Sequence, residues 1–122
     1  IKLPTQYMHT LWFTLRFVDS IQYEEIMNNL LKSEFLMATE KMSSNKVFSF
    51  GRDHGYHGRL LSHGIVAEQS LHVKDNILTG YCFTPQDGNA LLSSVAGTIQ
   101  YYYKDNWKEK MRLFNRYIFK NI

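Results

Sequence analysis

The chain has 122 residues, of which 44% are hydrophobic and 15% aromatic, enough for one compact core but too few for two domains of ordinary size. Its 14 Lys and Arg against 11 Asp and Glu give a net charge of only +3, and no apolar run approaches the roughly 20 residues of a membrane span. A single cysteine, Cys82, excludes an internal disulfide framework and is typical of a reducing compartment. We therefore expect a single domain over residues 1–122, located in the cytoplasm without a membrane segment.

The first third of the chain predicts a strand, a helix and a second strand. Apolar residues alternate with other types over residues 11–17, which is typical of a strand with two different faces. The less apolar face carries Trp12, Thr14 and Arg16. A helix capped by Ser20 is expected next, with Glu24 and Glu25 in its first turn. Its apolar stripe consists of Tyr23, Ile26, Met27, Leu30 and Leu31.

A second short strand is expected in FLMATE, residues 35–40, and the order strand, helix, strand implies a crossover that makes the two strands parallel. The next segment, residues 43–64, is rich in glycine, histidine and serine, so we expect a mobile loop with at most a short helical turn. Two strand-like runs follow, IVAEQSLHV and ILTGYCFT. Lys74, Asp75 and Asn76 between them are residue types that accept a tight hairpin turn.

The last third is helical by its pattern and basic by its composition. One helical stripe carries Trp107, Met111, Phe114 and Ile118, which favours a packing or interface helix over a nucleic-acid-binding one. The predicted fold is therefore α+β, with a mixed β-sheet, helices mainly on one face, and long C-terminal helices. The other face of the sheet, with Trp12 and Arg16, would be free for a subunit partner, so we expect self-association.

A histidine-rich cluster has ligand types that suit Zn²⁺. It consists of Asp53, His54, His57, His63 and, farther along the chain, Cys82. The spacing matches no tight metal motif, and the glycines between the histidines argue against a fixed helix that would hold them. We therefore predict exposed loop histidines and no metal site. Cys82 lies within an apolar strand, where a thiol is usually inert.

A second candidate site is PQDGNALLSSVAGTIQ, residues 85–100, where a strand ends and a helix begins. Asp87 or Asn89 is expected to cap the helix. Small residues follow on that helix: Ser93, Ser94, Ala96 and Gly97. This pattern leaves two alternatives open, a helix that packs tightly on its own sheet and a helix start that faces a ligand.

Two long runs resemble a known enzyme family. The run LPTQYMHTLWFTLRFVDSIQYEEIMNNLLKSEFLMATEK, residues 3–41, resembles the start of the C-terminal domain of archaeal-type (type II) glyceraldehyde-3-phosphate dehydrogenases. SLHVKDNILTGYCFTPQDGNALLSSVAGTIQ, residues 70–100, is similar to the hairpin and final helix of that domain. The second run is also similar to the ending of the related aspartate-semialdehyde dehydrogenases and N-acetyl-glutamyl-phosphate reductases.

The resemblance implies a substrate-binding and dimerisation domain of an NAD(P)-dependent semialdehyde or glyceraldehyde-3-phosphate dehydrogenase-like oxidoreductase. It implies that NAD or NADP is bound mainly by a nucleotide-binding domain absent from this chain, so that this chain alone is not catalytic. The expected partners are further copies of the chain and that missing domain or partner chain. The resemblance also assigns Asn89 to the nicotinamide end of the cofactor; no catalytic residue is assigned.

The chain departs from the family at the predicted substrate pocket. Where the family tends to have an arginine that meets the acidic substrate, residues 65–68 read Ile, Val, Ala, Glu, and the carboxylate of Glu68 would repel an anion. Either Arg59 from the preceding loop takes this role, with His63 beside it as a second substrate-binding candidate, or substrate binding has been lost.

Two other functions remain open at this point. One is a stand-alone, non-catalytic binding or assembly module that kept the sheet and lost the enzyme. The other, which the stripe of the C-terminal helices makes less favoured, is a nucleic-acid-binding domain that uses their basic side chains.

Overall fold

The structure, a computed structural model, describes residues 8–33, 35–56 and 64–117; for residues 55, 56, 85–92, 115 and 117 it describes only the backbone. The strands are β1 (Met8–Arg16), β2 (Leu36–Thr39), β3 (Gly64–Ala67), β4 (His72–Lys74) and β5 (Ile77–Pro85). The α-helices are α1 (Tyr23–Lys32), α2 (Ser44–Gly51), α3 (Gln86–Tyr103) and α4 (Trp107–Met111). Short turns of π- or 3-10 helix occupy Arg52–Tyr56, Glu68–Ser70, Lys104–Asn106 and Arg112–Tyr117.

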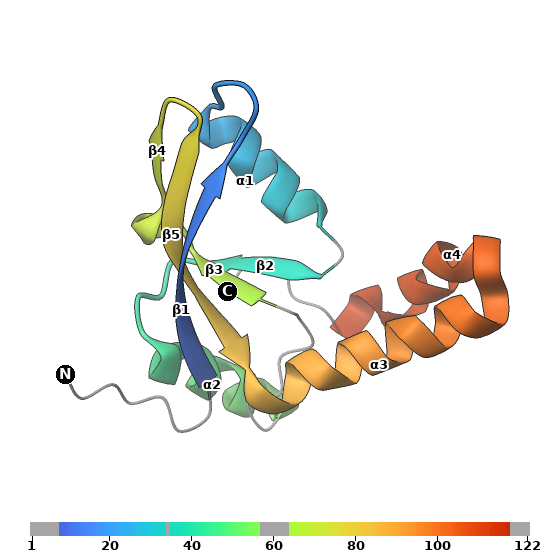
Figure 1. The fold of residues 1–122 in the computed structure, drawn as a ribbon. Helices are drawn as coiled ribbons and strands as arrows, with labels where there is room; N and C mark the ends of the chain where they lie inside the picture. The colour runs from blue at the N-terminus through green and yellow to red at the C-terminus, as the bar shows by residue number, and fades with distance from the viewer. Residues whose placement is uncertain (1–7, 34, 57–63, 118–122) are drawn as a thin grey trace.

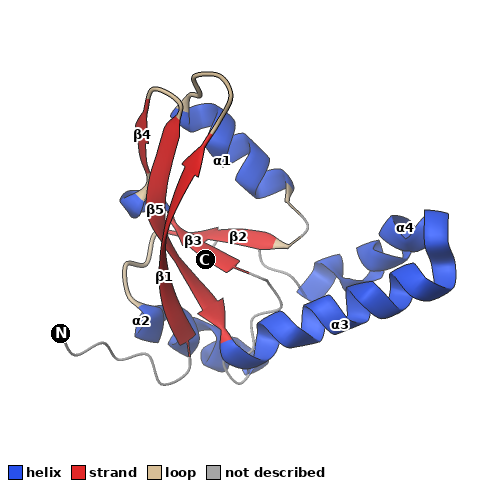
Figure 2. Cartoon of the chain, viewed as in Figure 1, coloured by secondary structure: helices blue, strands red, loops and turns tan. Residues whose placement is uncertain are grey.

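The strands form one mixed sheet in the order β1-β5-β3-β2, and β4 pairs with the other end of β5 (Figures 1 and 2). β1 and β5 pair antiparallel from Met8 opposite Pro85 to Arg16 opposite Ile77. β3 is antiparallel to β5 and parallel to β2. β1 and β2 therefore run in the same direction, as the crossover predicted, although β5 and β3 lie between them. The predicted α+β class, mixed sheet and long C-terminal helix are confirmed.

The two faces of the sheet have separate cores. α2 covers one face with a cluster of buried side chains: Met8, Met37, Val47, Ile65, Ala67 and Phe83. α1 covers the other face through Leu30, which packs with Ala38 and Val66. Because Met37 and Ala38 are neighbours in β2, and Ile65 and Val66 in β3, the alternation of the strands assigns these clusters to opposite faces. α1, α3 and α4 lie on one side of the sheet and α2 on the other (Figure 1).

The expected loop over residues 43–64 is helical in its first part, which corrects that prediction. Residues 44–51 form α2, and a π-helical turn continues to Tyr56. Val47 has no exposed surface, and Phe48 and Phe50 pack against the same cluster. Their contacts with the sheet stabilise a helix that the surrounding glycines and serines do not favour by themselves. Residues 57–63 lie outside the described residues, so the mobility of this segment stays a prediction.

The predicted hairpin turn is confirmed and is tied to the β1–α1 connection. Asp75, the first of the two loop residues, has a φ of 55°, the left-handed conformation that hairpin turns require and aspartate tolerates. The Asn76 side-chain amide donates to the Phe17 carbonyl at 2.8 Å, and the Phe17 amide donates to the Asn76 carbonyl, also at 2.8 Å. The Ile21 amide donates to the Asp75 carbonyl at 3.2 Å. One turn thus orients the entry to α1.

Both predicted helix caps are wrong. The residue before α1 is Gln22 rather than Ser20, and its side chain makes no capping hydrogen bond; Glu24 and Glu25 do lie in the first turn. α3 begins at Gln86, directly after β5, so Asp87 and Asn89 lie inside its first turn rather than before it. Continuous pairing of β5 up to Pro85 leaves no loop in which a capping residue could sit.

The C-terminal helices form a small core of their own. Met111 is buried among apolar side chains: Phe35, Val95, Ala96, Ile99, Trp107 and Phe114. The predicted stripe is therefore confirmed for Trp107, Met111 and Phe114, whereas Ile118 lies outside the described residues. Within the part of the chain that the structure describes, no helix is both long and apolar enough to cross a membrane.

We expect Val47→Ala to lower the free energy of unfolding by about 2 kcal/mol, because it leaves a cavity where α2 contacts the sheet. Lys46→Ala, at the adjacent exposed position of α2, is the control and should change it by less than about 0.5 kcal/mol. Urea denaturation followed by circular dichroism measures both. Equal, small effects would show that α2 does not contribute to the core.

Asn76→Asp should destabilise the chain by about 1–3 kcal/mol, because it replaces the donor to the Phe17 carbonyl with a carboxylate oxygen. Asn28→Asp adds the same charge at an exposed position of α1 and should be nearly neutral. Thermal and urea denaturation of the two variants give the comparison. An Asn76→Asp variant as stable as the parent chain would contradict the role of this hydrogen bond.

Candidate functional site

One face of the sheet is exposed toward the β4–β5 turn, where it carries aromatic and basic side chains. The register places Tyr81 opposite Trp12, Thr79 opposite Thr14, and Ile77 opposite Arg16. β4 adds His72 beside Thr79 and Lys74 beside Ile77. We call these eight residues the aromatic sheet face: Trp12, Thr14, Arg16, His72, Lys74, Ile77, Thr79 and Tyr81. Trp12 is 62% exposed and Tyr81 45% exposed, which places two large aromatic side chains in solvent.

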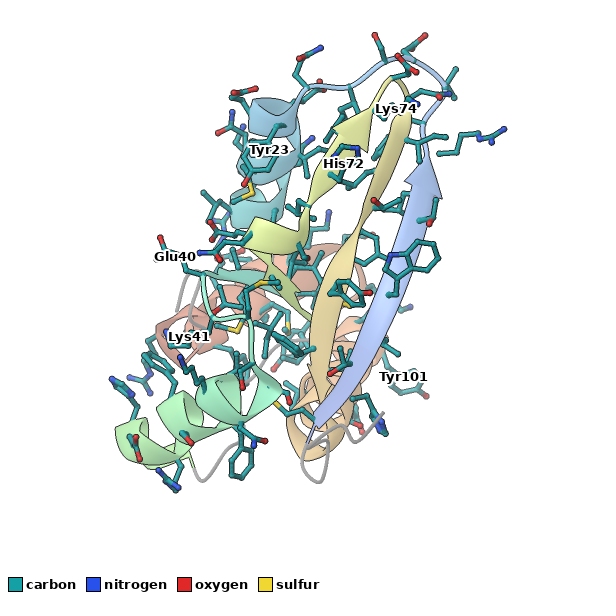
Figure 3. All side chains as sticks on the ribbon, turned by 90° about the vertical axis from the view of Figure 1, so that its left-hand side faces the viewer. Tyr23, Glu40, Lys41, His72, Lys74 and Tyr101 are labelled. Atoms are coloured by element: carbon teal, nitrogen blue, oxygen red, sulfur yellow. The ribbon has the colours of Figure 1, made fainter. Side chains whose placement is uncertain are left out.

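This face stays open because α2 is too short to cover it. The eight residues of α2 span about 12 Å, whereas the nine residues of β1 span about 30 Å. α2 packs at the end of the face that holds Met8 and Phe83. Figure 3 shows this side of the molecule, with His72 and Lys74 on β4 and no described helix in front of the upper sheet. The exposure of Trp12, Thr14 and Arg16 agrees with the free face expected from the sequence.

The charge on the aromatic sheet face is concentrated at its hairpin end. Arg16 and Lys74 flank Ile77 in one row of the sheet, and His72 lies in the next row. Trp12 and Tyr81 lie one row farther from this end. The face therefore combines a neutral aromatic end with a positive end, an arrangement that suits contact with another protein surface.

The side chains predicted for cofactor and substrate binding lie outside the described part of the structure. Asn89 lies in the first turn of α3, where only the backbone is described. Arg59 and His63 lie outside the described residues. Glu68, which stands where the family has its arginine, has a buried Oε1 with no hydrogen-bond partner among the described residues. A carboxylate at this position does not suit a phosphate or carboxylate ligand.

The small residues of α3 do not pack on the sheet, so that alternative is wrong. Ser93, Ser94 and Gly97 are exposed, and a Cβ built on Gly97 would meet nothing within 4 Å. Ala96 instead belongs to the cluster around Met111. The Thr98 hydroxyl donates to the Ser94 carbonyl at 2.8 Å, one turn earlier in the same helix. A ligand at the helix start stays a prediction.

The described residues of the histidine-rich cluster interact with neighbours in the chain. His54 Nδ1 lies 2.8 Å from the Phe50 carbonyl, and the His54 ring stacks on the Phe50 ring with centroids 4.1 Å apart. Asp53 forms an exposed ion pair with Arg52 at 2.9 Å. Among the described residues, no three His, Cys, Asp or Glu side chains lie close enough to hold a metal ion. His57 and His63 are outside that range.

The connection between β1 and α1 does not have the features that bind the phosphates of a dinucleotide. In dinucleotide-binding folds, a glycine-rich turn follows the first strand, and its backbone approaches the pyrophosphate. Here residues 17–22, between β1 and α1, contain no glycine, and α1 is not capped by a side chain. The neighbour of β1 is the antiparallel β5 rather than a parallel strand. The described residues therefore lack the strand, turn and helix arrangement of a dinucleotide-binding fold.

Cys82 lies on β5, half-buried on the face opposite Trp12 and Tyr81. Burial raises the pKa of its thiol, because removal from water disfavours the thiolate. The thiol is therefore protonated near neutral pH, which is the opposite of what a nucleophilic cysteine needs. This agrees with the inert role expected from its place in an apolar strand.

A scan against protein-family models found no family that matches the chain. A search of curated proteins found no significant match.

Alkylation of Cys82 by iodoacetamide should reach half of its maximal rate at a higher pH in the folded chain than in the urea-unfolded chain. The raised pKa delays formation of the reactive thiolate as the pH increases. Mass spectrometry over a pH series measures the rates, and the position of the midpoint does not depend on steric access. An equal or lower midpoint in the folded chain would contradict the desolvation of this thiol.

Proposed function

We propose that the chain is an assembly domain that self-associates through the aromatic sheet face. Its setting is an NAD(P)-dependent semialdehyde or glyceraldehyde-3-phosphate dehydrogenase-like oxidoreductase in the cytoplasm, in which this chain is the substrate-binding and dimerisation domain. The exposure of Trp12 beside Tyr81 on an uncovered sheet face is the observation that carries the proposal. The enzyme setting comes from the sequence resemblance.

Exposed aromatic side chains on a rigid sheet favour a protein contact. Trp and Tyr bury large areas at a small cost in side-chain entropy and are enriched among the residues that dominate binding energy. Trp12 and Tyr81 are held by a continuous backbone ladder, so little ordering is required on binding. The threonines beside them, Thr14 and Thr79, are short enough to allow close approach of a second sheet.

The charge distribution supports a two-fold arrangement of two copies. A two-fold axis that runs across the strands, through the middle of this face, would set the two copies antiparallel to one another. The same axis would place the positive ends, with Arg16 and Lys74, at opposite ends of the interface. Like charges would then not face one another, and the contact would be self-complementary.

The catalytic steps of such an enzyme are assigned to residues outside this chain. The reaction class requires a nucleophilic thiolate and a bound nicotinamide. Cys82 is half-buried and protonated near neutral pH, and the described residues lack the arrangement of a dinucleotide-binding fold. The cofactor contact assigned to Asn89 and the substrate contacts assigned to Arg59 and His63 are parts of this proposal.

The second candidate function is a stand-alone assembly module that uses the same face. The nucleic-acid alternative is less well supported, because cations of the C-terminal helices engage rings of those helices. Lys110 Nζ lies 5.4 Å from the centre of the Tyr103 ring, and Lys108 Nζ lies 5.8 Å from that of Trp107. These lysines pack along their own helices, which is typical of a solvated helix surface.

Tyr81→Glu and Trp12→Glu should each weaken self-association by at least about tenfold, because each replaces an aromatic ring of the contact with a charge that must be desolvated. Tyr101→Glu, at an exposed tyrosine near the end of α3, is the matched control and should leave the association constant unchanged. Sedimentation equilibrium over a range of concentrations measures it. A parent chain that stays monomeric at millimolar concentration, or equal effects of Tyr81→Glu and Tyr101→Glu, would refute the proposed interface.

Activity of the natural gene product separates the enzyme setting from the stand-alone module. Aldehyde-dependent formation of NADH or NADPH by that product supports the oxidoreductase setting. Self-association without such activity, over a panel of phosphorylated and carboxylated aldehydes, supports the stand-alone module instead.

A further inference from the structure

An apolar cavity of about 530 Å³ lies between α1 and the sheet, on the face opposite Trp12 and Tyr81. One wall comes from the sheet: Phe13, Leu15, Gly64, Val66, Leu78 and Cys82. Leu36 of β2 and Leu71, which precedes β4, extend this wall. The other wall comes from α1 and its connections: Phe17, Ile21, Ile26, Asn29, Leu30 and Ser33. The cavity is therefore bounded by both layers of the fold and is distinct from the aromatic sheet face.

The size of this cavity sets it apart from ordinary packing defects. Protein interiors contain few voids larger than a water molecule, whose share of liquid volume is about 30 Å³. Small-molecule pockets, in contrast, occupy about 300–1,000 Å³ and are lined mainly by hydrophobic side chains with a few polar groups. At about 530 Å³ the cavity lies within the range of ligand pockets.

The cavity is bounded by the contact between α1 and the sheet, and neighbouring side chains pack closely against two glycines, Gly80 and Gly64. α1 packs on the sheet through the buried Leu30 and the partly buried Met27, one turn apart in the second half of the helix. Gly80 has no side chain where Leu71 and Phe13 converge; a Cβ there would lie 2.8 Å from Leu71 Cδ2 and 3.0 Å from Phe13 Cζ. Gly64, which lines the cavity, would similarly bring a Cβ to 3.2 Å from Leu36 Cδ2.

The lining determines the chemistry of the occupant. Among the described residues that form it, none has a charged side chain, and their polar groups are limited to Asn29, Ser33 and the thiol of Cys82. Burial of an ion would require a partner that this lining does not offer, and a cluster of water molecules would need polar partners on most sides. The exposed lining residues, Leu15 of β1 and Asn29 of α1, mark the rim, so one polar atom of a ligand could reach water there.

We propose that the cavity between α1 and the sheet binds a small, uncharged, predominantly apolar molecule, such as a neutral aromatic compound or a medium-chain alcohol. This site is independent of the proposed assembly function, because it lies on the other face of the sheet. A protein segment is a poorer fit, since its backbone amides and carbonyls would find few hydrogen-bond partners inside this lining.

The test uses the neutral fluorescent probe 1-aminoanthracene with the complete chain. We expect saturable binding of one probe molecule per chain. Because Cys82 lines the cavity, a probe concentration ten times the Kd should slow alkylation of its thiol about tenfold. Decanol should displace the probe at lower concentration than decanoate, because the carboxylate must be desolvated.

Substitutions at the rim and inside the cavity locate the site. Leu15→Trp and Ile26→Trp place a larger side chain at the rim and on the helix wall, and each should weaken probe binding at least tenfold. Leu11→Trp is the matched control: Leu11 is 47% exposed, against 50% for Leu15, lies on the same strand face and does not line the cavity. Its probe affinity should equal that of the parent chain.

Three results would overturn the proposal. They are the absence of saturable probe binding by the folded chain, binding that leaves the alkylation rate of Cys82 unchanged, and equal affinities for Leu15→Trp and Leu11→Trp. Circular dichroism checks that each variant is folded. If Ile26→Trp unfolds, Leu15→Trp and the alkylation of the parent chain still decide the outcome.

Discussion

The antiparallel ladder between β1 and β5 is the constraint on which the rest of the structure depends. β5 is the central strand, with β1 along one edge and both β3 and β4 along the other. Its register places Trp12 beside Tyr81 on one face and Phe13 over Gly80 on the other. A slip of β1 by one residue against β5 would move Trp12 to the face under α1 and would move Phe13 and Leu15 out of the cavity lining. The Asn76 contacts to Phe17 hold this register at the hairpin end.

Both proposed surfaces follow from the same mismatch in length. β1 and β5 each have nine residues and extend about 30 Å, whereas α1 and α2 extend only about 15 Å and 12 Å. α2 therefore seals one end of its face and leaves the aromatic sheet face uncovered. α1 reaches across the opposite face and packs on it through Leu30 and Met27, and a cavity remains beside this contact. A protein partner on the aromatic sheet face and a ligand in the cavity would bury apolar surface that the helices leave exposed.

The C-terminal helices are stabilised differently from the sheet. α3 leaves the end of β5 and extends away from the sheet, and α4 folds back along it (Figure 1). Lys104, with a φ of 41°, lies at the reversal, and Met111 is buried between the two helices. This arm joins the rest of the molecule through Phe35, which comes just before β2. Changes in the arm should therefore affect the sheet mainly through this contact.

The sequence by itself determined the features that depend on neighbouring residues. Alternation predicted β1, helical spacing predicted α1 and the Trp107 stripe, and turn chemistry predicted the hairpin at Asp75, because each pattern reflects a local backbone periodicity. The tertiary structure decided α2, whose Val47 becomes buried only once distant strands meet it. It also decided the start of α3, which follows β5 directly at Gln86, earlier than the predicted caps. It also decided which faces stay open, since coverage depends on helix lengths relative to strands that are far apart in the chain. The candidate residues Asn89, Arg59 and His63 came from resemblance rather than from any such pattern, because side-chain convergence at a site is a property of the folded chain and not of its local periodicity.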